Sequence, residues 1–279
     1  MSADGAGAPG EPFFLDAPAG RRFCLFHPAH GACRAALVYV PPFAEEMNRA
    51  RRMAATSARA FSAQGIAVLL LDLHGCGDSA GEFADAHWDS WLDDIGAARA
   101  WLEARTGLRA GLWGLRLGGL LAAAAAQRAA TPPQRLLLWQ PVTSGLPHLN
   151  QFLRLRLAAD MLQAGEHDGM DALRRRLAEG ETLEIAGYEL AARLAQEVAE
   201  ADASMLTPPC RVDWFELAAA PDRPLPPAAS RLATVWRTRG ARVHLKMAEG
   251  PPFWATPEVT EAPALLDASL ACLREDADA

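Results

Sequence analysis

The chain is poor in lysine and has no long, uninterrupted apolar run. Lys246 is its only lysine, a skew that we interpret as codon bias. Because a transmembrane helix needs roughly 18 consecutive apolar residues, we expect no membrane span. Residues 1–11 are rich in glycine and alanine and lack the basic start and apolar centre of a signal peptide. We therefore expect a disordered tail over residues 1–11 and a soluble, cytoplasmic protein.

Metal-binding and disulfide patterns are also missing. The 5 cysteines are scattered and include no C-x-x-C pair, so they fit neither a disulfide framework nor a zinc site. Reduced thiols are the ordinary state of cysteine in the cytosol. The formal net charge of −7 disfavours nucleic acid and anionic membrane surfaces as partners. We expect no metal and no cofactor, and we expect a small molecule as the main partner.

Along most of the chain, short apolar runs alternate with segments in which apolar residues recur at the spacing of a helix. The runs at 35–40, 66–71, 134–141, 211–217 and 241–247 predict buried strands, and the spacing at 49–64, 88–106, 227–238 and 262–274 predicts helices. Two further strands, near 13–15 and 22–28, are expected at an antiparallel edge. This alternation predicts an α/β fold with a mostly parallel, doubly wound sheet.

The alternation is interrupted between residues 146 and 206. Helical stretches at 149–162, 169–178 and 191–201 and a short hairpin at 182–190 predict an inserted helical lid. The core would then consist of residues 12–145 and 207–279. The arginines of this insertion either line a cationic inner surface or form a solvated face, and we favour the solvated face.

One strand–turn–helix motif dominates the sequence. Residues 112–119 read Leu-Trp-Gly-Leu-Arg-Leu-Gly-Gly and precede a run of alanine and leucine. In α/β-hydrolases such a turn is called the nucleophile elbow; it has the pattern G-x-S-x-G and carries the nucleophilic serine. Here Gly114 and Gly118 are present, but Arg116 stands at the serine position. A guanidinium stays protonated and therefore cannot act as an acyl-transfer nucleophile.

The other parts of a catalytic triad are only partly represented. Asp222 follows the strand at 211–217 and either occupies the position of the triad acid or is a turn or capping residue. Pro252 stands where a hydrolase has its histidine, and no histidine follows His244. Oxyanion-binding amides are expected at Leu117 and near residues 43–44.

Several strings together resemble one family. They are Pro-Pro-Phe-Ala-Glu-Glu-Met-Asn at 41–48, Leu-Asp-Leu-His-Gly-Cys-Gly-Asp-Ser at 71–79, Trp-Gly-Leu-Arg at 113–116, Leu-Trp-Gln-Pro at 138–141 and Gly-Pro-Pro-Phe-Trp at 250–254. The chain resembles the "hydrolase 2, exosortase A system-associated" group of α/β-hydrolase-fold proteins. The resemblance implies the α/β-hydrolase fold, an association with exosortase and exopolysaccharide systems, and a family-wide arginine at the elbow with no triad histidine. Since the family is named for its fold and for the genes found near it, the resemblance implies hydrolase activity only weakly.

These residues lead to three functional hypotheses. The first is a pocket around Arg116 that binds an anionic or acyl-bearing small molecule, with Asp222, Glu45 or Glu46 as the partner of the guanidinium. The second is an ester or thioester hydrolase without a serine triad, in which Glu45 is the general base and Arg116 holds the anion; Ser79 or Cys76, near His74, are less favoured nucleophiles. The third is a non-catalytic scaffold for a protein of the same pathway. The expected binding residues are Phe43, Ala44, Glu46, His74, Ser79, Leu117 and Trp254.

Overall fold

A computed structural model describes residues 10–161, 168–220, 222–256 and 258–274. These residues form an eight-stranded sheet in the order β1-β2-β4-β3-β5-β6-β9-β10. Its strands are β1 (Glu11–Ala17), β2 (Gly20–His27), β3 (Ala35–Val40), β4 (Ile66–Leu71), β5 (Gly111–Leu115), β6 (Arg135–Trp139), β9 (Arg211–Ala218) and β10 (Val243–Glu249). Most of the predicted tail lies outside the described residues, and its last residue, Glu11, already belongs to β1.

The sheet is parallel except at one edge. Strands β3 to β6, β9 and β10 pair in parallel, whereas β1 pairs with β2 and β2 with β4 in antiparallel register. The central strands β5 and β6 are buried along their whole length, as expected for apolar strands covered on both faces. The predicted parallel sheet with an antiparallel edge is therefore confirmed.

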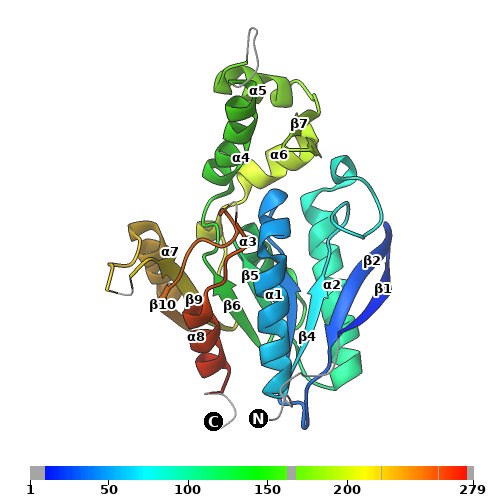
Figure 1. Ribbon diagram of the computed structural model, residues 1–279, viewed down its shortest axis with the longest axis vertical. Coiled ribbons are helices and arrows are strands. Elements are labelled where there is room, and N and C mark those ends of the chain that lie inside the picture. Colours follow the sequence, from blue (N-terminus) through cyan, green and yellow to red (C-terminus); the bar gives the residue numbers. More distant parts are fainter. Residues whose placement is uncertain (1–9, 162–167, 221, 257, 275–279) are drawn as a thin grey trace.

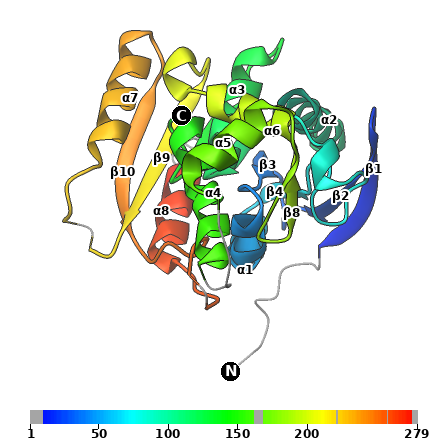
Figure 2. The same cartoon turned by 90° about the horizontal axis from the view of Figure 1, so that it is seen from above.

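Helices cover both faces of the sheet (Figures 1 and 2). The helices of the core are α1 (Glu45–Ala63), α2 (Trp88–Thr106), α3 (Leu117–Arg128), α7 (Pro227–Thr238) and α8 (Pro263–Arg274), with a 3-10 turn η1 (Phe83–Asp85) before α2. Helices α1 and α8 bury one apolar cluster against the sheet. Helices α2, α3 and α7 bury a second cluster on the opposite face. Among the described residues, no helix is long and apolar enough to span a membrane.

The segment between β6 and β9 rises above the core in Figure 1. It consists of α4 (Gly145–Asp160), α5 (Met170–Ala178), the hairpin β7 (Leu183–Ile185) and β8 (Tyr188–Leu190), α6 (Ala192–Glu200) and the turn η2 (Ala203–Met205). We call these elements the helical insertion. A Glu197 carboxylate oxygen of α6 accepts the Trp88 amide hydrogen at 2.7 Å, and the Trp236 indole donates to the Ala203 carbonyl at 2.9 Å. The insertion is thus tied to the first turn of α2 and to α7.

Two helices begin four residues earlier than the sequence pattern indicates. Helix α1 starts at Glu45 instead of residue 49, and α4 starts at Gly145 instead of residue 149; residue 162, the predicted end of the latter, lies outside the described residues. The first turn of α1 carries Glu45 and Glu46, whose negative charge suits a helix N-terminus although it breaks the apolar spacing. This correction places Glu46 on a helix instead of in a flexible loop.

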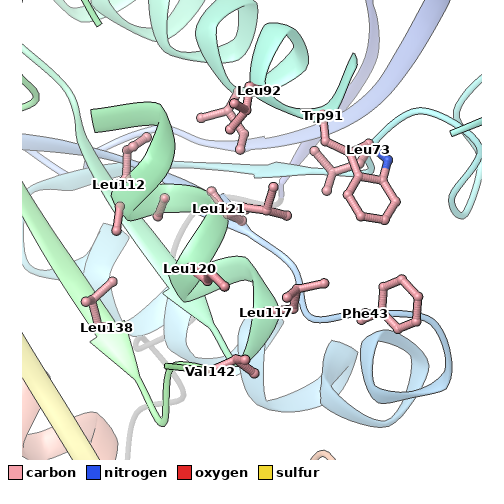
Figure 3. Packing of buried hydrophobic residues seen from close by; sticks show 14 of the residues in the cluster. Phe43, Leu73, Trp91, Leu92, Leu112, Leu117, Leu120, Leu121, Leu138 and Val142 are labelled. Carbon is pink, nitrogen blue, oxygen red and sulfur yellow. The ribbon is translucent and has the colours of Figure 1, made fainter. Parts of the chain in front are cut away.

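Glycines allow α3 to lie directly on the sheet. A Cβ atom at Gly118 would overlap the carbonyl oxygens of Val40 and Pro41, and one at Gly114 would overlap the backbone of Gly118. Figure 3 shows Leu117, Leu120 and Leu121 of α3 among the buried side chains of neighbouring elements. The close approach of α3 therefore depends on the absence of side chains at these two positions.

We expect Gly118→Ala to lower the free energy of unfolding by about 1–3 kcal/mol or more, because its methyl group overlaps backbone that cannot rotate away. Gly96→Ala is the matched control, since this glycine is exposed within α2 with nothing near its added Cβ. The control should gain up to about 1 kcal/mol from helix propensity. Urea unfolding measures both, and equal stability of Gly118→Ala and the unmodified chain would contradict the close approach.

Candidate functional site

The turn between β5 and α3 has a left-handed residue at its centre. Arg116 has φ 55° and ψ −121°, and Ala44, which precedes α1, has a nearly identical φ of 50° and ψ of −125°. Positive φ is costly for a residue with a side chain, and such residues concentrate at functional sites. The Arg116 amide donates to the Trp139 carbonyl, and the Arg116 carbonyl accepts from Gly119 and Val142. The surrounding backbone therefore holds the turn in this conformation.

The Arg116 side chain contacts three neighbouring segments. Its Nε lies 3.2 Å from Oε1 of Glu46 on α1, and Nη1 donates to the Gln140 carbonyl at 3.5 Å. Its Cζ lies over the Trp254 ring, 5.3 Å from the centroid. Of the three carboxylates predicted as partners, the structure selects Glu46. The Glu46 contact occupies Nε and leaves the terminal nitrogens with only the long bond to Gln140 among the described residues.

Glu46 is buried in an unusual electrostatic environment. Its side chain is 8% exposed, and Oε2 has no hydrogen-bond partner among the described residues. Burial raises the pKa of Glu46 to about 7, although the charge of Arg116 acts in the opposite direction. Glu46 therefore exchanges its proton near neutral pH, and the pair with Arg116 changes from neutral to cationic as the pH falls.

Glu216 and Gln140 form a second polar pair beside Arg116. Glu216 lies in β9 and accepts hydrogen bonds from the Gln140 amide at 2.7 Å and the Trp214 indole at 2.8 Å. The Gln140 side-chain oxygen accepts from the Leu217 amide at 2.6 Å, which locks the Gln140 side chain. Burial raises the pKa of Glu216 above its ordinary value, although the charge of the nearby Arg116 acts in the opposite direction. Glu216 is not among the residues predicted from the sequence, although a carboxylate within a buried apolar strand is a recognisable signal.

A histidine of the insertion also faces this region. His148 lies in the first turns of α4 and is 6% exposed. Burial and the charge of Arg116 lower the pKa of His148 to about 3, so the ring is neutral at working pH. Its ring lies 5.8 Å from that of Phe43. His148 is not among the residues predicted from the sequence, because nothing in the sequence places a side chain of the insertion beside Arg116.

A pocket of about 270 Å³ opens beside Arg116. Its polar lining includes Arg116, Gln140, Ser144, His148, Gln151 and Glu216. A second pocket of about 570 Å³ shares Gln140 and extends past Pro252 and Trp254. Both pockets lie where the carboxyl ends of β6 and β9 meet the loops, the usual position of ligands in open α/β sheets.

The predicted oxyanion donors occupy positions suited to an anion. Leu117 is the first residue of α3, so its amide has no acceptor within the helix. Phe43 and Ala44 precede the first turn of α1. Two helix N-termini therefore begin near Arg116, and both favour negative charge. The Phe43 side chain itself is buried among the rings of Phe83, Trp91 and Phe152.

The remaining predicted triad positions are less closely associated with Arg116. Asp222 is exposed in the segment between β9 and α7, and Pro252 is exposed after β10. Glu45 is half-buried, and burial raises its pKa. His244 lies at the amino end of β10, with Nδ1 3.3 Å from Asp213. It is therefore at the opposite end of the strand from the loops that surround Arg116.

His74 and Ser79 take part in a separate network. Arg22 donates to Asp94 at 2.7 Å and contacts His74 Nδ1 at 2.8 Å. The Ser79 hydroxyl donates to the Asp72 carbonyl at 2.6 Å and accepts the Phe23 amide hydrogen at 2.9 Å. The Ser79 hydroxyl is thus bonded on both sides to backbone groups.

Cys76 lies in the same loop as Ser79. Burial raises the pKa of its thiol to about 12, which removes the thiolate that a nucleophile needs. Among the described residues, no group of three or more His, Cys, Asp or Glu side chains is placed to hold a metal ion.

We expect Glu46→Gln to flatten the pH dependence of stability. Between about pH 4.5 and 7 the folded chain keeps a proton on Glu46 that the unfolded chain has released, so stability falls as the pH rises. This carboxyl accounts for a loss of about 3 kcal/mol across that window, which the variant avoids. Urea unfolding at pH 5, 6, 7 and 8 measures the difference, with Glu189→Gln as control because Glu189 is the exposed residue of β8. Parallel pH profiles for Glu46→Gln and the unmodified chain would contradict the raised pKa.

Comparison with known proteins identifies the scaffold. The family model described as "Serine aminopeptidase, S33" matches residues 31–215. The matched range includes β3, the elbow at Arg116 and the helical insertion, and it ends before Asp222 and Pro252. No curated protein sequence matches the chain.

Solved structures show the same fold at low sequence identity. Est1E from Butyrivibrio proteoclasticus with bound ferulic acid has a TM-score of 0.68 at 14% identity, covering 96% of this chain and 100% of that one. DcsB in complex with its substrate analogue has a TM-score of 0.64 at 15% identity, covering 95% and 98%. A serine hydrolase from Xanthomonas campestris, described as without a lid, has a TM-score of 0.58 at 17% identity, covering 96% and 95%. The predicted α/β-hydrolase fold is thus confirmed, and the chain belongs to the serine aminopeptidase S33 family of α/β-hydrolases.

Proposed function

We propose that the cleft around Arg116 binds an anionic small molecule, including acyl-bearing acids, and that the chain lacks a working Ser-His-Asp triad. The observation that carries this proposal is the position of Arg116, which occupies the nucleophile elbow and lines a pocket of about 270 Å³. Its guanidinium is held at Nε by Glu46, and its terminal nitrogens are suited to the paired oxygens of a carboxylate or phosphate.

Protonation of Glu46 supports anion binding. When Glu46 is ionised, it neutralises Arg116, and the pair attracts an anion only through local hydrogen bonds. When Glu46 takes up a proton near its raised pKa of about 7, the pocket gains a positive charge. We therefore expect anion affinity to increase as the pH falls from 8 to 6.

We further propose that the chain is a cytoplasmic accessory protein of exosortase A and exopolysaccharide systems. This proposal rests on the family resemblance of five sequence strings. Two of these strings supply side chains that contact Arg116, which itself belongs to a third string: residues 41–48 supply Glu46 and residues 250–254 supply Trp254. Because side chains from segments far apart in the sequence contact the same arginine, these strings are consistent with a shared role at one site.

Hydrolysis by a non-serine mechanism is the second candidate, and one observation favours it. A general base works best when its pKa lies near the working pH, and burial raises the pKa of Glu46 to about 7. Glu46, or Glu45 as the sequence predicts, would then accept a proton from water while Arg116 holds the anionic end of an ester or thioester.

The primary test measures anion binding by isothermal titration calorimetry with carboxylates and inorganic phosphate. We expect Arg116→Gln to weaken binding about 10- to 100-fold, because a hydrogen bond to a charged group contributes about 1.5–3 kcal/mol. Arg242→Gln is the matched control, since this arginine is exposed at the amino end of β10. Equal affinities for Arg116→Gln and the unmodified chain would rule out the proposed site.

A substrate panel separates binding from catalysis. The proposal expects no labelling by a fluorophosphonate probe and no turnover of p-nitrophenyl esters or acyl thioesters. Turnover that Glu46→Gln or Glu45→Gln abolishes would establish the second candidate. Stoichiometric labelling of a serine would show that a nucleophile lies elsewhere in the chain. Absence of both binding and turnover would leave the scaffold hypothesis.

A further inference from the structure

The pocket beside Arg116 is small, and both polar and apolar residues line it. Apart from the guanidinium, its lining offers the side chains of Gln140, Thr143, Ser144, His148, Gln151 and Glu216. Its volume of about 270 Å³ lies just below the range of about 300–1,000 Å³ that is typical of drug-sized ligands. Gln140 and Glu216 already pair with each other, whereas the His148 ring nitrogens have no partner among the described residues. A long unbranched acyl chain would leave these nitrogens unpaired, and such mismatches reduce affinity.

His148 points independently to a polar ligand. Both ring nitrogens are buried and lack a hydrogen-bond partner among the described residues, and His148 is one of the residues that line the pocket. Buried polar side chains are ordinarily hydrogen-bonded, so two unpaired nitrogens on one ring call for an explanation. A neutral imidazole has one donor nitrogen and one acceptor nitrogen. A ligand hydroxyl, which both donates and accepts, is the smallest group that pairs with either nitrogen.

The charges around His148 determine which ligand group it can recognise. The charge of Arg116 acts on His148, Glu46 on α1 pairs with Arg116, and Glu216 on β9 lines the same pocket. Arg116 disfavours a protonated imidazole, so His148 does not itself compete for the anionic end of the ligand. The anionic end of a ligand would therefore pair with Arg116, and a hydroxyl would pair with the side of the pocket formed by α4.

We infer that His148 is a specificity-determining residue and that the ligand of the Arg116 pocket is a small acid with one or more hydroxyl groups close to its anionic end. This inference rests on the proposed function and narrows it from anionic molecules in general to hydroxylated acids. It also assigns a role to the base of the helical insertion, where Ser144 and Gln151 line the same wall.

The test compares acids that differ only in their hydroxyl groups. Glycerate is paired with propionate, and gluconate with hexanoate, and their dissociation constants are measured by calorimetry at pH 6.5. For the unmodified chain we expect each hydroxylated acid to bind at least 10-fold more tightly, since each hydrogen bond contributes about 2- to 10-fold. Hydrophobic burial would favour hexanoate over gluconate, so it cannot produce this preference.

Variants assign the preference to His148. We expect His148→Phe to reduce the ratio of affinities for the hydroxylated and the plain acid to below 3-fold while propionate still binds. We expect His148→Gln to keep part of this preference. Thermal unfolding of both variants establishes that they fold, and the ratio is read only from folded protein. A role of His148 in stability alone would leave the ratio unchanged.

The outcomes separate this inference from the proposed function. Equal or tighter binding of propionate and hexanoate by the unmodified chain overturns the inference alone, as does an unchanged ratio in folded His148→Phe and His148→Gln. The proposed function and this inference both fail if no acid binds the unmodified chain. They also both fail if the Arg116→Gln variant binds acids as tightly as the unmodified chain does.

Discussion

The ion pair between Arg116 and Glu46 is the constraint on which the site depends. The elbow turns the Arg116 side chain out of the sheet, and its backbone is held by Trp139, Gly119 and Val142. A guanidinium that is only partly exposed needs a carboxylate partner, because an unpaired charge removed from water is costly. Glu46 meets this need from α1, and the pair joins two segments that lie 70 positions apart in the chain.

Burying a carboxylate for this purpose affects proton binding throughout the cleft. Glu46 and Glu216 both have raised pKa values because they are removed from water, while the charge of Arg116 opposes each shift. His148 responds in the other sense, since burial and Arg116 both keep its ring neutral. The site therefore combines one permanent cation with carboxyl groups that burial makes easier to protonate.

The family scaffold and the chemistry of this chain are separable. The matched range of 31–215 and the solved structures establish the α/β-hydrolase fold, and a fold of this kind supports many unrelated functions. What distinguishes this chain is the set of side chains at the loop ends. Arg116 stands at the turn between β5 and α3, Trp254 supplies an aromatic face to its guanidinium, and the insertion contributes His148 to the pocket lining.

The sequence by itself determined the order of strands and helices, the elbow and the presence of a helical insertion, because these depend on apolar periodicity and glycine spacing. It also limited the partner of Arg116 to three carboxylates. Only the tertiary structure selected Glu46, showed the hydrogen-bond partners of His74 and Ser79, and brought Glu216 and His148 into one pocket with Arg116. The physical reason is that periodicity reports which face of an element is buried, whereas contacts between side chains from distant elements depend on how those elements pack.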